Sequence, residues 1–184
     1  MQEITALEFK EILNTKNIAS DSLQELVVNE LIRQGKTVAT AESCTGGLIS
    51  KRLTEVSGVS QVFQCGVCSY ANEIKHRVLG VSNETLDMVG AVSQEVARQM
   101  AQGVRELAQA DYGVSTTGIA GPTGGTAEKP VGLVYIAVNS AKGTTVVKSF
   151  LTEPENSNRE NIRKNASDLA IFTLLSELYK ETLE

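Results

Sequence analysis

The chain has 184 residues, with 17 Lys and Arg against 22 Asp and Glu and a formal net charge of −5 at pH 7. This length suits one domain with a sizeable core and is short for two. The acidic balance disfavours general affinity for nucleic acid or an anionic membrane. No apolar run reaches the roughly 20 residues of a membrane-spanning helix, and the acidic start of the chain differs from a secretion signal. We therefore expect a cytoplasmic protein.

The beginning of the chain predicts an extension followed by a domain. Residues 1–20 are polar and only weakly amphipathic, which is typical of a short helix or a mobile extension, so we place the domain at residues 21–184. Ser22 and Glu25 have the spacing of a capping box, which predicts a helix that ends before Gly35. The next elements are a strand at 36–41 and a helix at about 46–56.

The alternation of strands and helices continues to the end of the chain and predicts a three-layer α/β/α sandwich with a mixed, mostly parallel sheet. The next elements are a strand at 62–70, a short helix capped by Asn72 that ends at Gly80, and a helical turn from Ser82. A helix follows at 94–110, with an apolar face made by Val96, Met100, Val104, Leu107 and Ala108. The chain then continues with a strand at 111–117, a glycine-rich loop at 118–130, paired strands at 133–138 and 144–150, and a last helix capped by Ser157 or Asn158.

Three predicted strands end at polar residues, near positions 42, 70 and 117. In a parallel arrangement these ends meet at one edge of the sheet, where open α/β sheets bind ligands. Ser43, Cys44 and Thr45 follow the first of these strands and precede a helix, whose amide groups favour a phosphate or an oxyanion. The alternative is that Ser43 or Thr45 only caps that helix.

Lys75 is the candidate base for a nucleophilic serine. The only histidine, His76, lies beside it on a helix predicted to be exposed, which disfavours a Ser-His-Asp arrangement. A lysine can accept the serine proton when burial or nearby cations lower its pKa. Tyr70 could relay a proton or hold the amine, and Thr116 or Thr117 could hold the lysine or the substrate. The alternatives are a solvated lysine and ordinary strand threonines.

Arg159 and Arg163 are four residues apart, so one face of the last helix would present both guanidinium groups. A substrate phosphate is one use for this pair. Ion pairs with Glu155 or Glu160 are the other use that the spacing allows.

The three cysteines cannot form a full disulfide framework, and free thiols are expected in the cytoplasm. Cys65 and Cys68 match C-x-x-C, but a second pair is missing and the expected strand would point them to opposite faces. The sequence thus predicts neither a metal nor a cofactor.

Five motifs together resemble the CinA carboxy-terminal domain family, whose characterised members are nicotinamide mononucleotide amidohydrolases. The resemblance covers about residues 22–180 in the right order and leaves residues 1–20 outside. The motifs are Ala41-Glu-Ser-Cys-Thr-Gly-Gly47, Ser69-Tyr-Ala-Asn-Glu-Ile-Lys75, Gly90-Ala-Val-Ser93, Thr117-Gly-Ile-Ala-Gly-Pro122 and Glu128-Lys-Pro-Val-Gly132.

The resemblance implies that the carboxamide of nicotinamide mononucleotide is hydrolysed to nicotinic acid mononucleotide and ammonia, without a metal. It makes Ser43 the nucleophile and Lys75 the base, with Tyr70 and Thr117 as supports of the lysine. Cys44 is intrinsically more nucleophilic than its neighbour, so the choice of Ser43 rests on the family. Amides of the turn at 44–47 would hold the oxyanion. The candidate substrate-binding residues are Glu42, Thr45, Gly46, Gly118, Arg159 and Arg163.

Two other functions stay open from the sequence. One is a non-catalytic nucleotide-binding or partner-binding module, as the competence-related name of the family suggests. The other is phosphate ester hydrolysis, which usually needs metal-binding carboxylates, whereas the motifs supply chiefly Glu42. Many relatives carry this domain behind an amino-terminal domain resembling molybdopterin-binding proteins, whereas residues 1–20 alone precede it in this sequence, so we expect a stand-alone enzyme. It is expected to be a homo-oligomer, with a dimer favoured by symmetry.

Overall fold

Six strands form one mixed sheet in the order β1-β6-β5-β4-β2-β3. The computed structural model describes residues 2–153 and 157–182. The pairs β1–β6, β2–β3 and β2–β4 are parallel, whereas β4–β5 and β5–β6 are antiparallel, which confirms the predicted mixed, mostly parallel sheet. The strands are β1 (Gln2–Thr5), β2 (Val38–Glu42), β3 (Phe63–Cys68), β4 (Tyr112–Gly118), β5 (Leu133–Ser140) and β6 (Gly143–Phe150).

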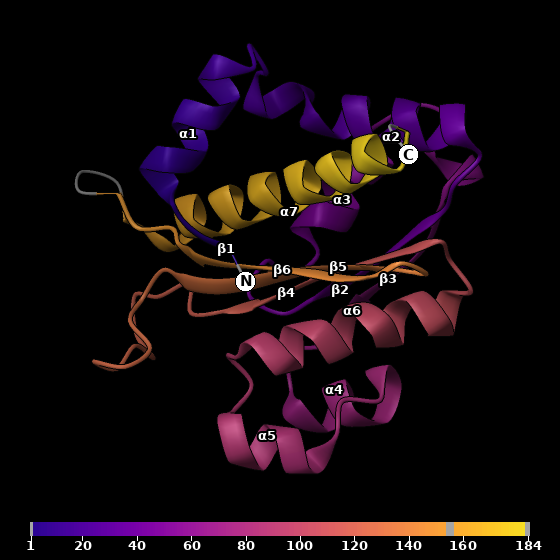
Figure 1. Cartoon of the computed structure of the whole chain (residues 1–184). Coiled ribbons are helices and arrows are strands. Elements are labelled where there is room, and N and C mark those ends of the chain that lie inside the picture. Colours follow the sequence, from indigo (N-terminus) through magenta and orange to yellow (C-terminus); the bar gives the residue numbers. More distant parts are fainter. Residues whose placement is uncertain (1, 154–156, 183–184) are drawn as a thin grey trace.

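Helices cover both faces of this sheet, so the three-layer prediction is also confirmed (Figure 1). One face carries α1 (Ala6–Thr15), α2 (Leu23–Gln34), α3 (Leu48–Thr54) and α7 (Arg159–Thr182), and the other carries α4 (Asn72–Leu79), α5 (Asn83–Val89) and α6 (Gln94–Ala108).

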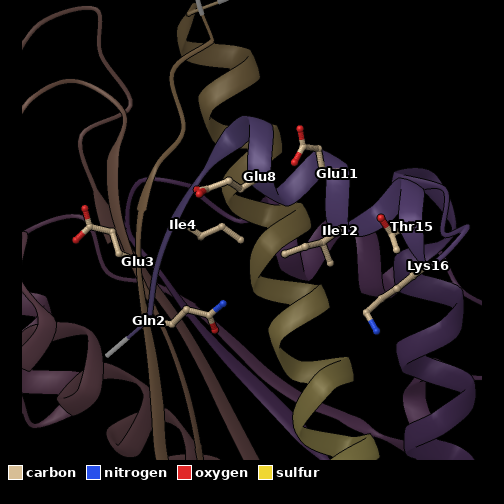
Figure 2. A pocket seen from close by; sticks show the side chains of 8 residues that line it. All are labelled: Gln2, Glu3, Ile4, Glu8, Glu11, Ile12, Thr15 and Lys16. Atoms are coloured by element: carbon tan, nitrogen blue, oxygen red, sulfur yellow. The ribbon is translucent and has the colours of Figure 1, made fainter.

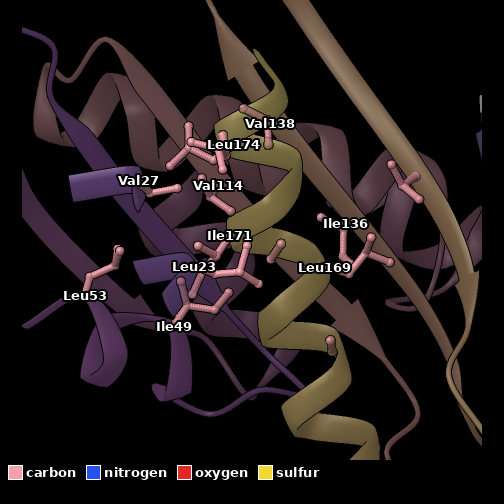
Figure 3. Close-up of a cluster of buried hydrophobic side chains, with 14 of the residues drawn as sticks. Leu23, Val27, Ile49, Leu53, Val114, Ile136, Val138, Leu169, Ile171 and Leu174 are labelled. Carbon is pink, nitrogen blue, oxygen red and sulfur yellow. The ribbon is translucent and has the colours of Figure 1, made fainter. Parts of the chain in front are cut away.

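The main core lies between the sheet and the α2, α3 and α7 helices (Figure 3). Alternate residues of β4 and β5, such as Val114 and Ile136, point to this face because side chains of a strand alternate between its two faces. Leu53 of α3 and Leu174 of α7 belong to the same cluster. The opposite face carries a smaller cluster in which Ala39 and Ala41 of β2 meet α4 and α6.

The first 20 residues contribute a strand as well as the expected helix. β1 pairs with β6, where Gln2 lies opposite Val147, and α1 buries Phe9 and Leu13 in the main core. A capping box starts α1, since the Glu8 amide donates to Thr5 Oγ1 while the Thr5 amide donates to the Glu8 carboxylate at 2.7 Å. This segment therefore extends the sheet and covers part of the core.

Three local predictions were wrong, and one was confirmed. Ser22 holds the N-cap position of α2 but forms no capping box: its backbone is already helical and its hydroxyl donates to the Ala19 carbonyl. Asn72 is the first residue of α4, and the extended Ala71 holds the N-cap position. Leu107 is 53% exposed, because Ala97 and Ala101 bring the neighbouring side of α6 onto the sheet and leave Leu107 at the margin. Asn158 caps α7, accepting a hydrogen bond from the Asn161 amide at 2.8 Å.

The α4 and α6 helices approach one another at backbone distance. A Cβ atom placed on Gly103 of α6 would lie only 1.8 Å from the carbonyl oxygen of Leu79, the last residue of α4. Real Cβ contacts never approach so closely to a main-chain atom. Gly103 thus fixes the position of α4, the helix that carries Lys75.

We predict that Gly103→Ala lowers the free energy of unfolding by about 1–3 kcal/mol through overpacking. The direction is informative, because replacing glycine by alanine inside a helix ordinarily stabilises it by about 0.5–1 kcal/mol. Denaturant unfolding of both proteins measures the change. Glu106→Ala, at an exposed position of the same helix, is the matched control and should change stability by less than about 0.5 kcal/mol. A Gly103→Ala protein as stable as the native one would contradict the close packing.

Candidate active site

The carboxyl ends of β2, β3 and β4 lie side by side, as the sequence predicted. Glu42, the last residue of β2, pairs with Cys68 on one side and with Thr116 on the other. The hydrogen-bond ladder continues one residue further, since the Ser69 amide donates to the Glu42 carbonyl at 2.9 Å and the Ser43 amide donates to the Thr116 carbonyl at 3.0 Å. The next row across the three strands is therefore Ser69, Ser43 and Thr117.

This row faces the α4 and α6 layer. Two residues earlier, Ala41 and Val67 pack into the cluster beneath those helices, and Ser115 donates its hydroxyl to the carbonyl of Ala97 on α6. Side chains two residues apart on a strand share a face. Thr117 accordingly donates its hydroxyl to the Ala91 carbonyl, just before α6, at 2.7 Å. The alternation places Ser43 toward the same layer as Lys75.

Lys75 is buried with only 1% of its surface exposed, so the solvated lysine that the sequence left open is excluded. Its ammonium group donates to the carbonyl oxygen of Ser69 at 2.7 Å and to that of Tyr70 at 3.2 Å. Burial lowers the pKa of the amine below its ordinary value, and the nearby Cys44 side chain acts in the opposite direction. More of this amine is therefore neutral at a given pH than in a solvated lysine.

Glu42 holds the turn after β2 against the start of α3. It is fully buried, and its carboxylate accepts hydrogen bonds from the amides of Ile49 and Ser50 and from the Ser50 hydroxyl at 2.7 Å. A carboxylate suits the positive end of a helix. Glu42, rather than Ser43 or Thr45, thus makes the contact that the sequence assigned to a capping residue. The prediction that Glu42 contacts substrate gains no support from these bonds.

Glycines and threonines shape the rest of the turn. Gly46 and Gly47 have φ values of 60° and 89°, a left-handed conformation that glycine adopts without strain. The Gly46 amide donates to the Ser43 carbonyl at 3.2 Å, which removes it from the amides available to an oxyanion. The buried Thr45 hydroxyl shares a 2.7 Å hydrogen bond with the hydroxyl of Thr116. The side chain of Ser43, in contrast, is partly exposed.

Cys44 differs from Ser43 in its surroundings. Its side chain belongs to the main core and is 5% exposed. Burial raises the pKa of the thiol to about 12, although the amides of Cys44 and Thr45 and the hydroxyl of Thr116 lower it in part. The thiolate is the reactive form of cysteine, so Cys44 is a poor nucleophile near neutral pH.

The two arginines of α7 contact different parts of the site. Arg159 donates to the Gly121 carbonyl at 2.7 Å and to the Tyr70 hydroxyl at 2.9 Å. Arg163 donates twice to the Thr45 carbonyl, at 2.7 and 3.2 Å, and so holds the turn that follows Ser43. Of the alternative ion-pair partners, Glu155 lies outside the described residues.

A cavity of about 220 Å³ opens at the turn after β2, where Cys44, the neighbour of Ser43 in the chain, lines it. The glycine-rich loop after β4 forms one wall of it, and Gly121 packs so closely on Val131 that a Cβ atom would lie 2.6 Å from that side chain. Tyr70, which is 66% exposed, and Arg159 stand at the rim. The lining residues are Cys44, Tyr70, Gly118, Ile119, Ala120, Gly121, Thr123, Gly124 and Arg159.

A larger hollow of about 480 Å³ lies at the far edge of the sheet, between β1 and α1, where Figure 2 shows Ile4 and Ile12 on either side of it. Two of its three lining carboxylates have partners, since Glu3 pairs with Lys148 and Glu8 caps α1. Another hollow of about 480 Å³ lies between α2, α3 and α7. There the buried Arg52 is committed to Asp168 at 2.6 Å. We therefore place the candidate site at the smaller cavity.

The two residues predicted to support Lys75, Tyr70 and Thr117, use their side chains elsewhere, since the Thr117 hydroxyl donates to the Ala91 carbonyl. Tyr70 holds the amine through its main-chain carbonyl, while its phenol meets Arg159. His76 is exposed and its Nδ1 lies 2.7 Å from the Val81 carbonyl, in keeping with the expected surface role. Sequence reasoning missed Ser69, because a serine at the end of a strand carries no signal of its own. Its contact with Lys75 is made by the main chain.

Within residues 2–153 and 157–182, no three His, Cys, Asp or Glu side chains gather as a metal site would require. The helices of that part of the chain also include none that is long and apolar enough to cross a membrane.

The sequence matches known proteins over most of its length. The model of the CinA C-terminal domain matches residues 20–178. A relative from Caldanaerobacter subterraneus subsp. tengcongensis, whose name describes it as competence-damage inducible, is 51% identical over 158 residues, 85% of this chain and 37% of that protein. A CinA-like protein of Kosmotoga olearia is 49% identical over 84% of this chain and 36% of its own length. The chain thus spans less than half the length of these relatives.

Solved structures match over nearly their whole length. The competence/damage inducible protein CihA from Agrobacterium tumefaciens has a TM-score of 0.81 and 40% identity, with 85% of this chain and 94% of that one covered. A competence-damaged protein (CinA) superfamily member from Enterobacter cloacae has a TM-score of 0.81 and 30% identity, with coverages of 88% and 93%.

The thiols provide a test of the site's geometry. We predict that iodoacetamide at pH 8 alkylates the exposed Cys68 at least about tenfold faster than the buried Cys44, whose thiol stays protonated. Peptide mass spectrometry after timed quenching measures both rates. Denaturant should abolish the difference, which serves as the control. Equal labelling of the two cysteines in the folded protein would show that Cys44 is accessible and ionised.

Proposed function

The chain belongs to the CinA C-terminal domain family, and from this we propose that it is an amidohydrolase that converts nicotinamide mononucleotide to nicotinic acid mononucleotide and ammonia. The substrate follows from the resemblance of the motifs to characterised members. The observation that carries the mechanism is the burial of Lys75 beside the turn of Ser43. A surface nucleotide-binding module has no use for a desolvated amine at this point.

In the proposed acylation, Lys75 acts in its neutral form. The two carbonyls that hold it accept both N–H groups of the neutral amine, which leaves the lone pair to accept a proton from the Ser43 hydroxyl. The serine oxygen then attacks the carboxamide carbon. Lys75 passes its proton to the departing nitrogen, the C–N bond breaks and ammonia leaves. The product of this step is an ester between Ser43 and the nicotinoyl group.

The oxyanion of this step is assigned to the turn after β2. The Gly46 amide is occupied by the Ser43 carbonyl, so the amides of Cys44, Thr45 and Gly47 are the remaining candidates, of which the first two also act on the Cys44 thiol. Arg163 supports this geometry from the opposite side by holding the Thr45 carbonyl.

We assign the nucleotide to the cavity at the turn after β2, which Cys44 lines and Ser43 precedes. Its volume, about 220 Å³, is smaller than the roughly 300–1,000 Å³ typical of pockets for drug-sized ligands, which suits the pyridine ring and part of the ribose. Tyr70 offers an aromatic face at the rim, and Arg159 offers a guanidinium group for the phosphate. We therefore choose Arg159 over Arg163 as the phosphate ligand.

Replacement of the dyad tests the chemistry. We predict that Ser43→Ala and Lys75→Met each lower ammonia release from nicotinamide mononucleotide by about 10³-fold or more, because each removes a group that acts in the transition state. Cys44→Ala should keep most of the activity. The measurement is steady-state ammonia release with chelator present.

Circular dichroism and thermal unfolding of the variants control for loss of fold. A native protein that binds the nucleotide but never releases ammonia would favour the non-catalytic binding module. Turnover that survives in Ser43→Ala but is lost in Cys44→Ala would assign the nucleophile to the thiol instead.

The arginines can be separated by their kinetic effects. We predict that Arg159→Ala raises the KM by about tenfold or more, since it removes a charged ligand of the phosphate. Arg163→Ala should instead lower kcat and the thermal midpoint, since it releases the Thr45 carbonyl. Initial rates over a range of substrate concentration, with thermal unfolding, measure both effects. The reverse pattern would exchange the two assignments.

A further inference from the structure

Two of the sequence motifs, Gly90-Ala-Val-Ser93 and Glu128-Lys-Pro-Val-Gly132, have no part in the mechanism above. The structure brings them together. The ammonium group of Lys129 donates a hydrogen bond at 2.7 Å to the carbonyl of Val89, which is the last residue of α5 and precedes the first motif. Lys129 thus joins two segments that are 40 residues apart in the chain.

The carbonyl that Lys129 contacts lies at the end of a helix. The last carbonyl groups of a helix have no partner within it, and a cation is favoured at this end. Gly90 turns the chain with a φ of 73°, and a Cβ atom on it would lie 3.3 Å from Lys129 Nζ. The glycine therefore leaves room for the ammonium group. The next residue, Ala91, accepts the hydroxyl of Thr117, so this segment lies at the candidate site.

Lys129 also begins the second arm of the glycine-rich loop, on which the first arm rests. The Lys129 carbonyl accepts a hydrogen bond from the Thr126 amide at 2.9 Å, and its own amide donates to the Thr126 hydroxyl at 3.0 Å. Gly121 of the first arm packs directly on the side chain of Val131, two residues after Lys129. Because Gly121 lines the cavity, this wall takes its position from the arm that Lys129 anchors.

Arg159 holds the same loop from the other side, through its 2.7 Å hydrogen bond to the Gly121 carbonyl. In the proposed function this guanidinium group also binds the substrate phosphate, which weakens its hold on the loop. The described residues that line the cavity do not include Lys129. Its bond to Val89 is therefore outside the reach of the bound nucleotide and can hold the loop while Arg159 is engaged.

We propose that Lys129 is a positioning residue, which holds the wall of the nucleotide cavity in the shape that binds substrate. This inference rests on the proposed amidohydrolase function. Lys129 acts through the loop and has no contact with the reacting atoms. Its loss should therefore weaken substrate binding and leave the chemistry of Ser43 and Lys75 unchanged.

Lys129→Met tests this role, because it keeps the length of the side chain and removes the ammonium group. We expect the KM for nicotinamide mononucleotide to rise by about fivefold or more, while kcat changes by less than about twofold. Initial rates over a range of substrate concentration measure both. Lys129→Arg, which keeps a charged donor, should restore the native KM. Lys180→Met, which removes an exposed lysine from the last turn of α7, is the matched control and should leave the KM unchanged.

A second measurement follows the loop without any substrate. A protease that cleaves after glutamate is applied to the folded protein, and mass spectrometry follows cleavage after Glu128, with each rate divided by that of the same chain unfolded. We expect this ratio to rise by about fivefold or more in Lys129→Met, because release of the loop exposes its backbone. Lys129→Arg and Lys180→Met should keep the native ratio.

A Lys129→Met protein with the native KM would overturn the inference, even if cleavage after Glu128 became faster, since the bond would then hold the loop but not the cavity. A loss confined to kcat would overturn it as well. The proposed function fails separately: a native protein that releases no ammonia overturns the amidohydrolase. In that case the dissociation constant of the nucleotide, measured by calorimetry, replaces the KM, and the same outcomes decide the role of Lys129.

Discussion

The candidate site depends on one buried amine held between two main-chain carbonyls. Desolvation alone makes a lysine a weaker cation, but it does not direct the lone pair that results. In this protein the carbonyls of Ser69 and Tyr70 accept the N–H groups and so fix the direction left for the lone pair. Both carbonyls belong to the segment between β3 and α4. The proposed base is therefore oriented by the chain that precedes it by five and six residues, and α4 needs only to return Lys75 to that segment.

The turn after β2 is rigid for a related reason, because its polar groups are satisfied from several sides. Glu42 fixes the start of α3, Thr45 bonds to Thr116 of β4, and Arg163 of α7 holds the Thr45 carbonyl. Three separate elements thus converge on a few residues, while Ser43 keeps a partly exposed side chain. Such an arrangement would hold the proposed nucleophile on a supported scaffold, and correct positioning can contribute several kcal/mol to catalysis.

Much of this could be predicted from the sequence. The alternation of elements predicted the layers, and parallel strands imply that residues 42, 70 and 117 meet at one edge. The sequence could not predict contacts made by the main chain, such as those of Lys75, since carbonyl groups are common to all residues. It also missed β1, a four-residue strand defined only by its pairing with β6 at the other end of the chain. Ser22 stands at the start of α2 as predicted but makes no capping bond, because a 3₁₀ turn already sets its backbone.

The four-residue spacing of Arg159 and Arg163 predicts only part of their arrangement. Four residues on a helix place two side chains on one face, which is correct, and suggest a shared ligand, which the contacts do not support. The first turn of α7 lies beside both the glycine-rich loop and the turn after β2, so a step of four residues leads from one to the other. Arg159 reaches the glycine-rich loop and Tyr70, and Arg163 reaches Thr45. The same residue type thus contacts the rim of the cavity from one position and the turn of Ser43 from the other, a division that the path of the helix determines.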